Sequence, residues 1–190
     1  ASPDGTEASC LEYAARDGRV RYVRHEVNCG MAGNFHRALD LARGEFFKWQ
    51  ASDDMCGPQL LEVCVPPLEA DGDVILCFPR CAFIDDSEQV TGEVTAANRP
   101  RNFAADQPSD RLLAVLLYVV WCIEIYGVFR TDALRQARYR SQPGSEKVIL
   151  AELALLGKFV QAPSTQFYFR RHQEQYSEMD NSLQATWMSG

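Results

Sequence analysis

The stretch Trp49-Gln50-Ala51-Ser52-Asp53-Asp54 places two neighbouring carboxylates directly after a short apolar run, Phe46-Phe47-Lys48-Trp49. The run predicts a buried strand over residues 46–50, so the carboxylates follow its end, at the edge of a sheet where open α/β folds bind ligands. Two adjacent acidic groups repel each other, and a bound cation relieves that repulsion. Carboxylate oxygens suit Mg²⁺ or Mn²⁺, and these ions commonly bridge to phosphates. The alternative interpretation is an Asp-rich surface turn.

A segment rich in glycine and asparagine, Asn28-Cys29-Gly30-Met31-Ala32-Gly33-Asn34, comes shortly before that stretch. It leads into a predicted amphipathic helix over residues 32–43, because apolar residues recur at helical spacing from Phe35 to Ala42 and Gly44 follows. Glycines allow a ligand to approach the backbone closely, and an Asn amide can both donate to and accept from a nucleotide. The alternative is a simple turn and helix N-cap.

Together with Gly44-Glu45-Phe46-Phe47 and Ser52-Asp53-Asp54, this segment resembles the family 2 glycosyltransferases, which have the GT-A nucleotide-sugar fold. Members of that family carry an N-x-G-x-x-x-(A/G)-N segment, a helix ending in A-x-G-(E/D)-(Y/F), and an x-D-D metal motif. Further matches follow in the family order, namely Ser2-Pro3-Asp4-Gly5-Thr6, Tyr126-Gly127-Val128-Phe129-Arg130, Gly144-Ser145-Glu146-Lys147-Val148-Ile149-Leu150-Ala151-Glu152-Leu153 and Phe169-Arg170-Arg171-His172. The resemblance covers nearly the whole chain.

The resemblance implies a role for each matched polar residue. It implies that Asp54 and His172 bind the metal ion, and that Glu146 is the catalytic base. The residues that it assigns to nucleotide-sugar binding are Asn28, Gly30, Gly33, Asn34, Asp53 and Arg171, with Asp53 near the ribose or diphosphate. Arg170 and Arg171 could each neutralise the diphosphate, but alternation along a strand lets only one of them face the site.

The chain departs from the family pattern at three positions. Ala51 stands where the fuller D-x-D-D motif has its first Asp, and Phe35 stands where a basic residue often occurs. Glu146 stands where the family usually has Asp as the base. It opens a predicted helix over residues 146–156, where the helix dipole favours a carboxylate. A purely structural role at the helix N-terminus is therefore the alternative for Glu146.

The order of strands and helices predicts an α/β fold with a mixed, mainly parallel sheet flanked by helices, and the resemblance implies that this fold is GT-A-like. Helices are predicted over 6–16, from Pro58, over 109–120 and after Thr131, and Pro66-Pro67 is expected to interrupt the second of these. Strands are predicted over 20–24, 74–78, 124–129, 159–162 and 166–170, and residues 85–107 are predicted to be irregular. We assign residues 1–172 to a transferase domain and 173–190 to a tail. Because the motif order begins inside a loop, we expect the first strand, first helix and second strand of the fold to lie upstream of Ala1.

Composition excludes some classes of protein. With 190 residues, 46% hydrophobic content and a net charge of −7, the chain can build a core but lacks the basic face that binding a nucleic-acid polymer needs. Its seven cysteines contain no C-x-x-C pair, which favours reduced thiols in a cytoplasmic protein over a zinc site or a disulfide framework. The longest apolar run, Leu112 to Ile123, is too short for a transmembrane segment. Peripheral contact with the inner face of the membrane stays open.

From the resemblance we expect transfer of a sugar from a nucleotide-diphospho-sugar donor to an acceptor hydroxyl, with Mn²⁺ or Mg²⁺ as cofactor. The resemblance also implies inversion at the anomeric carbon, and the acceptor is left open between a sugar, a lipid and a protein. Two alternatives remain. One is a nucleotidyltransferase of similar fold, which would need a Gly-rich phosphate loop with a Lys in the upstream region. The other is a non-catalytic nucleotide- or carbohydrate-binding module, such as an inactive truncated transferase.

Overall fold

The computed structural model describes residues 4–93, 102–137, 142 and 144–171. Its helices are α1 (Thr6–Arg16), α2 (Gly30–Leu41), α3 (Leu60–Ala70), α4 (Pro108–Tyr118), α5 (Thr131–Leu134) and α6 (Ser145–Leu156), with a 3₁₀ helix, η1 (Ile123–Tyr126). Its strands are β1 (Phe46–Phe47), β2 (Met55–Cys56), β3 (Val74–Ile84), β4 (Val90–Glu93), β5 (Val128–Arg130) and β6 (Lys158–Arg170). The predicted α/β class is therefore confirmed. His172 and the predicted tail over 173–190 lie outside the described residues.

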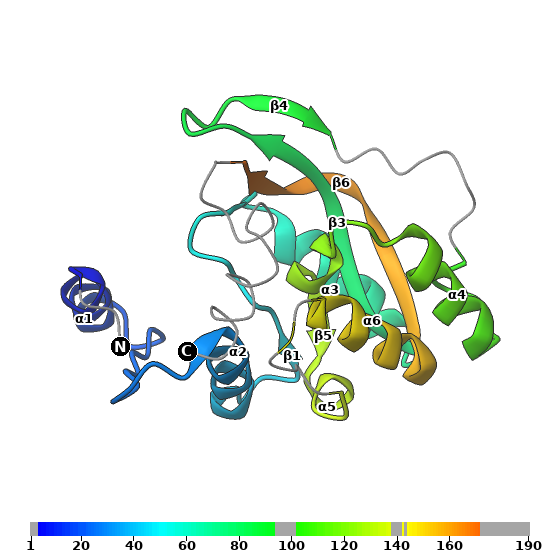
Figure 1. Cartoon of the computed structure of the whole chain (residues 1–190), viewed down its shortest axis with the longest axis horizontal. Coiled ribbons are helices and arrows are strands. Elements are labelled where there is room, and N and C mark those ends of the chain that lie inside the picture. The colour runs from blue at the N-terminus through cyan, green and yellow to red at the C-terminus, as the bar shows by residue number, and fades with distance from the viewer. Residues whose placement is uncertain (1–3, 94–101, 138–141, 143, 172–190) are drawn as a thin grey trace.

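Six strands form one mixed sheet in the order β1-β5-β3-β6-β2, with β4 paired to β3 off that path. The two long strands, β3 and β6, pair in parallel from Val74↔Lys158 to Ile84↔Arg170 and cross the middle of the molecule together (Figure 1). The other pairings of these strands are antiparallel, so the sheet is mixed, as predicted, but less parallel than expected. One reason is local, since a tight turn over residues 85–89 joins β3 to β4 and tight turns join antiparallel strands.

Helices cover both faces of the pair formed by β3 and β6. On one face, α3 packs its buried side chains against the odd-numbered core residues Cys77 and Cys81 of β3. On the other face, α4 and α6 pack around Leu76 and Phe78. Both faces of β3 are therefore buried, which explains why the run Val74–Phe78 is apolar throughout instead of alternating.

Helix α3 shows that the predicted interruption at Pro66-Pro67 is wrong. The helix continues through both prolines to Ala70, and it begins at Leu60 rather than at Pro58. Each proline removes one backbone hydrogen bond. However, Leu60, Cys64 and Leu68 follow one another at intervals of four residues and are all buried against the sheet. Burial of a Leu side chain contributes about 1.5–3 kcal/mol, so the packed face outweighs the missing bonds.

Four predicted strands differ in the structure. Residues 20–24 pair with no strand in the described chain, and an extended segment becomes a strand only when a neighbour takes up its backbone hydrogen bonds. The segment 124–129 is η1 followed by β5. Gly127 lies between them, and a Cβ at that position would come within 2.7 Å of the Cys77 carbonyl oxygen on the neighbouring strand. The two strands predicted over 159–162 and 166–170 are one strand, β6.

The remaining predicted elements are present with shifted ends. The helices predicted over 6–16, 32–43, 109–120 and 146–156, and after Thr131, are α1, α2, α4, α6 and α5. The strand predicted over 46–50 is only the short β1, and β4 lies inside the segment predicted to be irregular. Helix α1 lies apart from the sheet and has no buried residue (Figure 1). All seven cysteines are free, as predicted. Within the described ranges, no helix has the length and apolarity needed to cross a bilayer.

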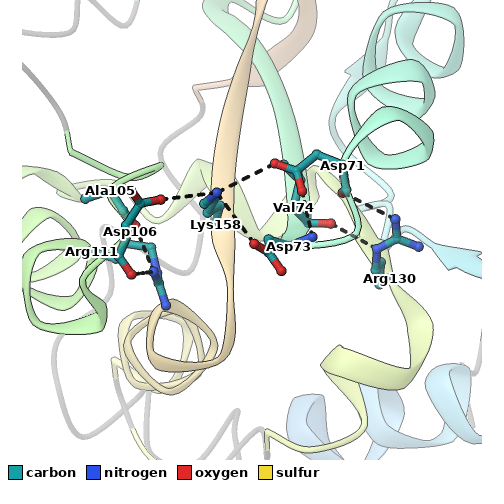
Figure 2. A network of polar contacts seen from close by, with 8 residues as sticks. All are labelled: Asp71, Asp73, Val74, Ala105, Asp106, Arg111, Arg130 and Lys158. Atoms are coloured by element: carbon teal, nitrogen blue, oxygen red, sulfur yellow. Dashed lines mark hydrogen bonds and ion pairs between the residues drawn. The ribbon is translucent and has the colours of Figure 1, made fainter.

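A network of polar contacts closes the amino-terminal edge of β3 and β6 (Figure 2). Lys158, the first residue of β6, has its Nζ 3.7, 3.6 and 3.4 Å from carboxylate oxygens of Asp71, Asp73 and Asp106. The hydrogen bond to Asp106 and the charges of the aspartates raise the pKa of Lys158. These contacts tie the loops before β3 and α4 to the start of β6.

Two arginines bind backbone carbonyls at the same edge. Arg130 of β5 donates from Nε to the Val74 carbonyl at 3.0 Å. Arg111 of α4 is buried, and it donates from Nε to the Ala154 carbonyl at 2.8 Å and from Nη1 to the Ala105 carbonyl at 2.7 Å. Carbonyls in the last turn of a helix lack helical partners. Because Ala154 is in the last turn of α6, Arg111 supplies that partner and joins α4 to α6.

Substitution of Arg111 by Met should lower the free energy of unfolding by about 2–3 kcal/mol, because buried carbonyls lose a charged donor. Urea unfolding followed by far-UV circular dichroism measures the change. The matched control is Arg135→Met, whose exposed side chain pairs with Asp132, and its loss should stay below about 1 kcal/mol. Equal losses in the two variants would contradict the role given to Arg111.

Candidate active site

The acidic pair lies at the carboxyl-terminal edge of β3 and β6. Asp54 directly precedes β2, which pairs antiparallel with the end of β6 so that Met55 lies opposite Tyr168. The backbone N–H of Arg170, the last residue of β6, donates to Asp54 Oδ1 at 2.9 Å. Asp54 is half-buried by this arrangement, whereas Asp53 is exposed.

The side chain of Arg170 fixes the backbone around the acidic pair. Its Nε donates to the Asp53 carbonyl at 2.8 Å, and its Nη1 donates to the Asp85 carbonyl at 2.7 Å. Its Nη2 also lies 3.7 Å from Glu88 Oε1. Arg170 therefore joins the acidic turn to the β3–β4 turn. The sequence signal for this contact was the Arg-Arg pair, which does not by itself tell which arginine faces the carboxylates.

Trp49 anchors helix α2 to the acidic segment. Its ring is buried and lies 5.0 Å from the Phe35 ring and 5.8 Å from the Phe129 ring, measured between centroids. Its Nε1 donates to the Phe35 carbonyl at 3.2 Å. The aromatic Phe35, which stands where a basic residue often occurs in the family, is thus a packing residue that positions α2.

The residues predicted to bind the nucleotide at the start of α2 form a helix-opening turn. Asn28 Oδ1 accepts the Gly30 N–H at 3.0 Å, and Gly30 has φ 68°, a left-handed conformation that favours glycine. A Cβ on Gly33 would lie 2.9 Å from the Cys29 Cβ. Asn34 is exposed. These contacts give Asn28, Gly30 and Gly33 a structural task, and their role in nucleotide binding stays a prediction.

The half-buried position of Asp54 changes its ionisation. The pKa of Asp54 is raised from its ordinary value of 3.8 to about 6, mainly by burial and to a smaller extent by the nearby charge of Asp53. The Arg170 N–H and the charges of Lys48 and Arg170 act in the opposite direction. Burial also lowers the pKa of Lys48. Asp54 is therefore a carboxylate whose charged form has few stabilising partners inside the protein, and a cation would favour that form.

Tyr126, the last residue of η1, packs against the strand whose end contacts the acidic pair. Its ring stacks on Phe167 of β6 with a centroid separation of 5.2 Å and an interplanar angle of 17°. Burial raises the pKa of the Tyr126 phenol, and the carboxylates of Asp54, Glu146 and Asp53 raise it further. The Tyr126 hydroxyl is therefore within electrostatic range of carboxylates from both ends of the sequence. Sequence analysis had given Tyr126 no role beyond the motif that it opens.

Glu146 lies in the first turn of α6, immediately after Gly144, which has φ 79°, and the fully buried Ser145. The helix packs against η1. Burial raises the pKa of the Cys122 thiol, which precedes η1, to about 12, and the charge of Glu146 contributes to that shift. Glu146 thus belongs to the first turn of the helix that packs against η1.

The two arginines at the end of β6 lie in different surroundings. Arg170 contacts the acidic turn, whereas the Arg171 guanidinium lies over the rings of Trp121 and Phe83, 5.1 and 5.5 Å from their centroids. The role predicted for Arg171 in nucleotide binding stays a prediction. The structure adds Arg170 and Trp121 to the residues around the site.

The metal-binding prediction rests on Asp54 and His172, and His172 lies outside the described residues. Among the residues that the structure does describe, no three His, Cys, Asp or Glu side chains gather closely enough to hold a metal ion. If Asp54 binds a metal ion, the other ligands of that ion would therefore come from outside the described His, Cys, Asp and Glu side chains. Oxygen atoms of a bound diphosphate are one source of such groups.

The fold has counterparts among solved structures. The Staphylococcus aureus TarS structure of residues 1–349 superposes with a TM-score of 0.65 at 14% identity, covering 94% of this chain and 51% of that chain. The same protein in complex with UDP gives a TM-score of 0.64 at 14% identity, covering 91% and 49%. The fold is thus the GT-A fold, as predicted.

The chain belongs to glycosyl transferase family 2, because the family model matches residues 1–118. It is 29% identical over 82 residues to the uncharacterized glycosyltransferase MJ1057 of Methanocaldococcus jannaschii, covering 43% of this chain and 28% of that protein. It is also 27% identical over 116 residues to EpsH of Bacillus subtilis, likewise named as a glycosyltransferase, covering 61% and 30%. The chain therefore spans less than a third of the length of these curated relatives.

The raised pKa of Asp54 predicts a pH-dependent stability. Between pH 3.8 and about 6 the folded chain holds a proton that the unfolded chain has released, so stability falls as pH rises through this window. Asp54→Asn can still accept the Arg170 N–H but has no charge. Its gain in unfolding free energy over the parent chain should grow from pH 4 to 6, to on the order of 1 kcal/mol, since water still reaches the carboxylate. Urea unfolding at several pH values measures the gain, and a gain independent of pH would contradict the assignment.

Proposed function

We propose that this chain transfers a sugar from a nucleotide-diphospho-sugar to an acceptor hydroxyl. Family membership supports glycosyl transfer, and the UDP complex of the TarS neighbour supports a nucleotide diphosphate as part of the donor. The observation that carries the proposal is the packing around Tyr126. Its ring stacks on Phe167 of β6, the strand whose last N–H binds Asp54, and its helix η1 packs against α6, whose first turn contains Glu146. One site therefore contains a carboxylate suited to a diphosphate-bound cation and a second carboxylate suited to proton transfer.

The donor set fits a hard divalent cation, Mn²⁺ or Mg²⁺. Asp54 is half-buried with a raised pKa, so an adjacent cation would stabilise its ionised form. Asp54 and the predicted ligand His172 would hold the ion. When bound, the ion supplies Lewis-acid stabilisation of the diphosphate leaving group. Arg170 keeps the Asp53–Asp54 backbone in place through its contacts with the Asp53 and Asp85 carbonyls.

The second half of the reaction falls to Glu146. Its carboxylate takes the proton of the acceptor hydroxyl as the hydroxyl oxygen forms a bond to the anomeric carbon, while the bond from that carbon to the diphosphate oxygen breaks. Attack from the face opposite the diphosphate inverts the anomeric centre. Glu146 lies in the first turn of α6, the helix that packs against η1.

Binding of the donor nucleotide should depend on metal and on Asp54. We expect UDP to bind at least about tenfold more weakly when Mn²⁺ is removed or when Asp54 is replaced by Ala. Isothermal titration calorimetry of UDP with and without Mn²⁺ measures both effects. Asp73→Ala, at the opposite edge of the sheet, is the matched control and should leave UDP affinity unchanged. Affinity that is indifferent to both metal and Asp54 would show the metal assignment to be wrong.

Replacement of Glu146 by Gln removes the proposed base and keeps the shape of the side chain. The turnover number should fall by about 10²-fold or more, with UDP affinity nearly unchanged, because the substitution affects proton transfer and not donor binding. Glu152→Gln in the same helix is the matched control, since six residues along α6 turn it to another face. If the two variants turn over a nucleotide-sugar equally fast, Glu146 is only a helix N-terminal residue.

A further inference from the structure

One face of β6 presents Phe167 and Phe169, because alternate residues of a strand point the same way, and Arg171 follows directly after the strand. On the neighbouring strand, Cys81 lies opposite Phe167 and Phe83 lies opposite Phe169. Tyr126 of the proposed active site stacks on Phe167. The next aromatic group along this face is Trp121, and it has no task in the mechanism described above.

Trp121 is held against this face by its neighbours. Its ring makes an edge-to-face contact with Phe83, with centroids 5.8 Å apart, and Phe83 in turn contacts Phe169 at 6.1 Å. The Arg171 guanidinium lies 5.1 Å from the Trp121 centroid. Despite these contacts Trp121 remains 41% exposed, whereas the other described tryptophan, Trp49, is 5% exposed. Trp121 is thus a fixed ring with an uncovered surface.

The segment from Trp121 to Tyr126 is short and contains one unusual backbone conformation. Cys122 has φ 53°, a left-handed conformation that non-glycine residues adopt at an energetic cost. This residue turns the chain from Trp121 into η1, which packs against α6 and ends at Tyr126. The Glu146 charge acts on the Cys122 thiol, next to Trp121 in the chain. Trp121 is therefore on the side of the site where Glu146 would meet the acceptor.

We propose that the exposed ring of Trp121 stacks against a sugar ring of the acceptor, so that the acceptor is a carbohydrate. This inference rests on the proposed function, because it places the acceptor beside Glu146. A pyranose has an apolar face of C–H groups that packs on an aromatic ring, and hydroxyls around its rim. The indole offers a large rigid surface, and Arg171 carries planar N–H donors beside it that suit hydroxyl groups.

The test uses the 190-residue chain, with methyl glycosides of common hexoses and disaccharides as probes and UDP with Mn²⁺ as the donor-site reference. Saturation-transfer difference NMR titrations give the glycoside affinity, and calorimetry gives the UDP affinity. In Trp121→Leu the best-bound glycoside should lose about tenfold in affinity, while Trp121→Phe, which keeps a ring, should retain most of it. Tyr13→Leu is the matched control, since Tyr13 is 63% exposed on α1, apart from the site.

Each outcome has one meaning. The proposed stacking of Trp121 on an acceptor sugar would be supported by three results together. These are loss of glycoside affinity in Trp121→Leu, rescue in Trp121→Phe, and unchanged UDP affinity in both variants. Unchanged glycoside affinity in Trp121→Leu, or no glycoside binding by the parent chain, would overturn it. A fall in UDP affinity would also overturn it, because the ring would then serve the donor nucleotide. If the parent chain binds glycosides through Trp121 but binds no UDP, the proposed function would be overturned, and the sugar-binding role of Trp121 would still hold.

Discussion

The parallel pairing of β3 with β6 is the constraint on which the other parts of this domain depend. The two strands stay paired over 11 residues of β3, from Val74 to Ile84. Their shared faces supply the surfaces on which α3 packs from one side and α4 and α6 pack from the other. Because both strands end at the same edge, Ile84 and Arg170 lie side by side, and the turns that follow them are brought together there.

That shared edge explains how the site is assembled from distant parts of the sequence. The short β2 joins β6 at this edge and carries the acidic turn with it, so the Arg170 backbone meets Asp54 across 116 positions in the chain. Strand alternation then gives the two neighbouring arginines different surroundings. Arg170 reaches the carbonyls of Asp53 and Asp85, and Arg171 lies over Trp121. The opposite edge is closed by Lys158 and its three aspartates, which holds the start of the same strand pair (Figure 2).

The two carboxylates given roles in the proposed reaction are positioned by different elements. Burial opposes ionisation of Asp54, so the fold keeps this group in a state that a bound cation would relieve. Glu146 lies in the first turn of α6, the helix that packs against η1. Tyr126 lies within the influence of both, on a ring stack with Phe167 that fixes its position. In the proposed reaction, Asp54 serves cation binding and Glu146 serves proton uptake.

Much of this protein was determined by local sequence. The apolar run before Asp53-Asp54, the glycine-rich opening of α2, the helix that begins near Glu146 and the family resemblance all depend on residues within a few positions of one another, and the structure contains each of these elements. The predictions made from the sequence are wrong where distant contacts outweigh local preference. Helix α3 continues through Pro66-Pro67 because its buried face packs on the sheet, and residues 20–24 are not a strand because no described neighbour pairs with them. Only the tertiary structure decided that Arg170 rather than Arg171 meets the acidic turn, and that Trp121 lies beside the site, since strand register and packing fix these contacts and neither can be read from nearby residues.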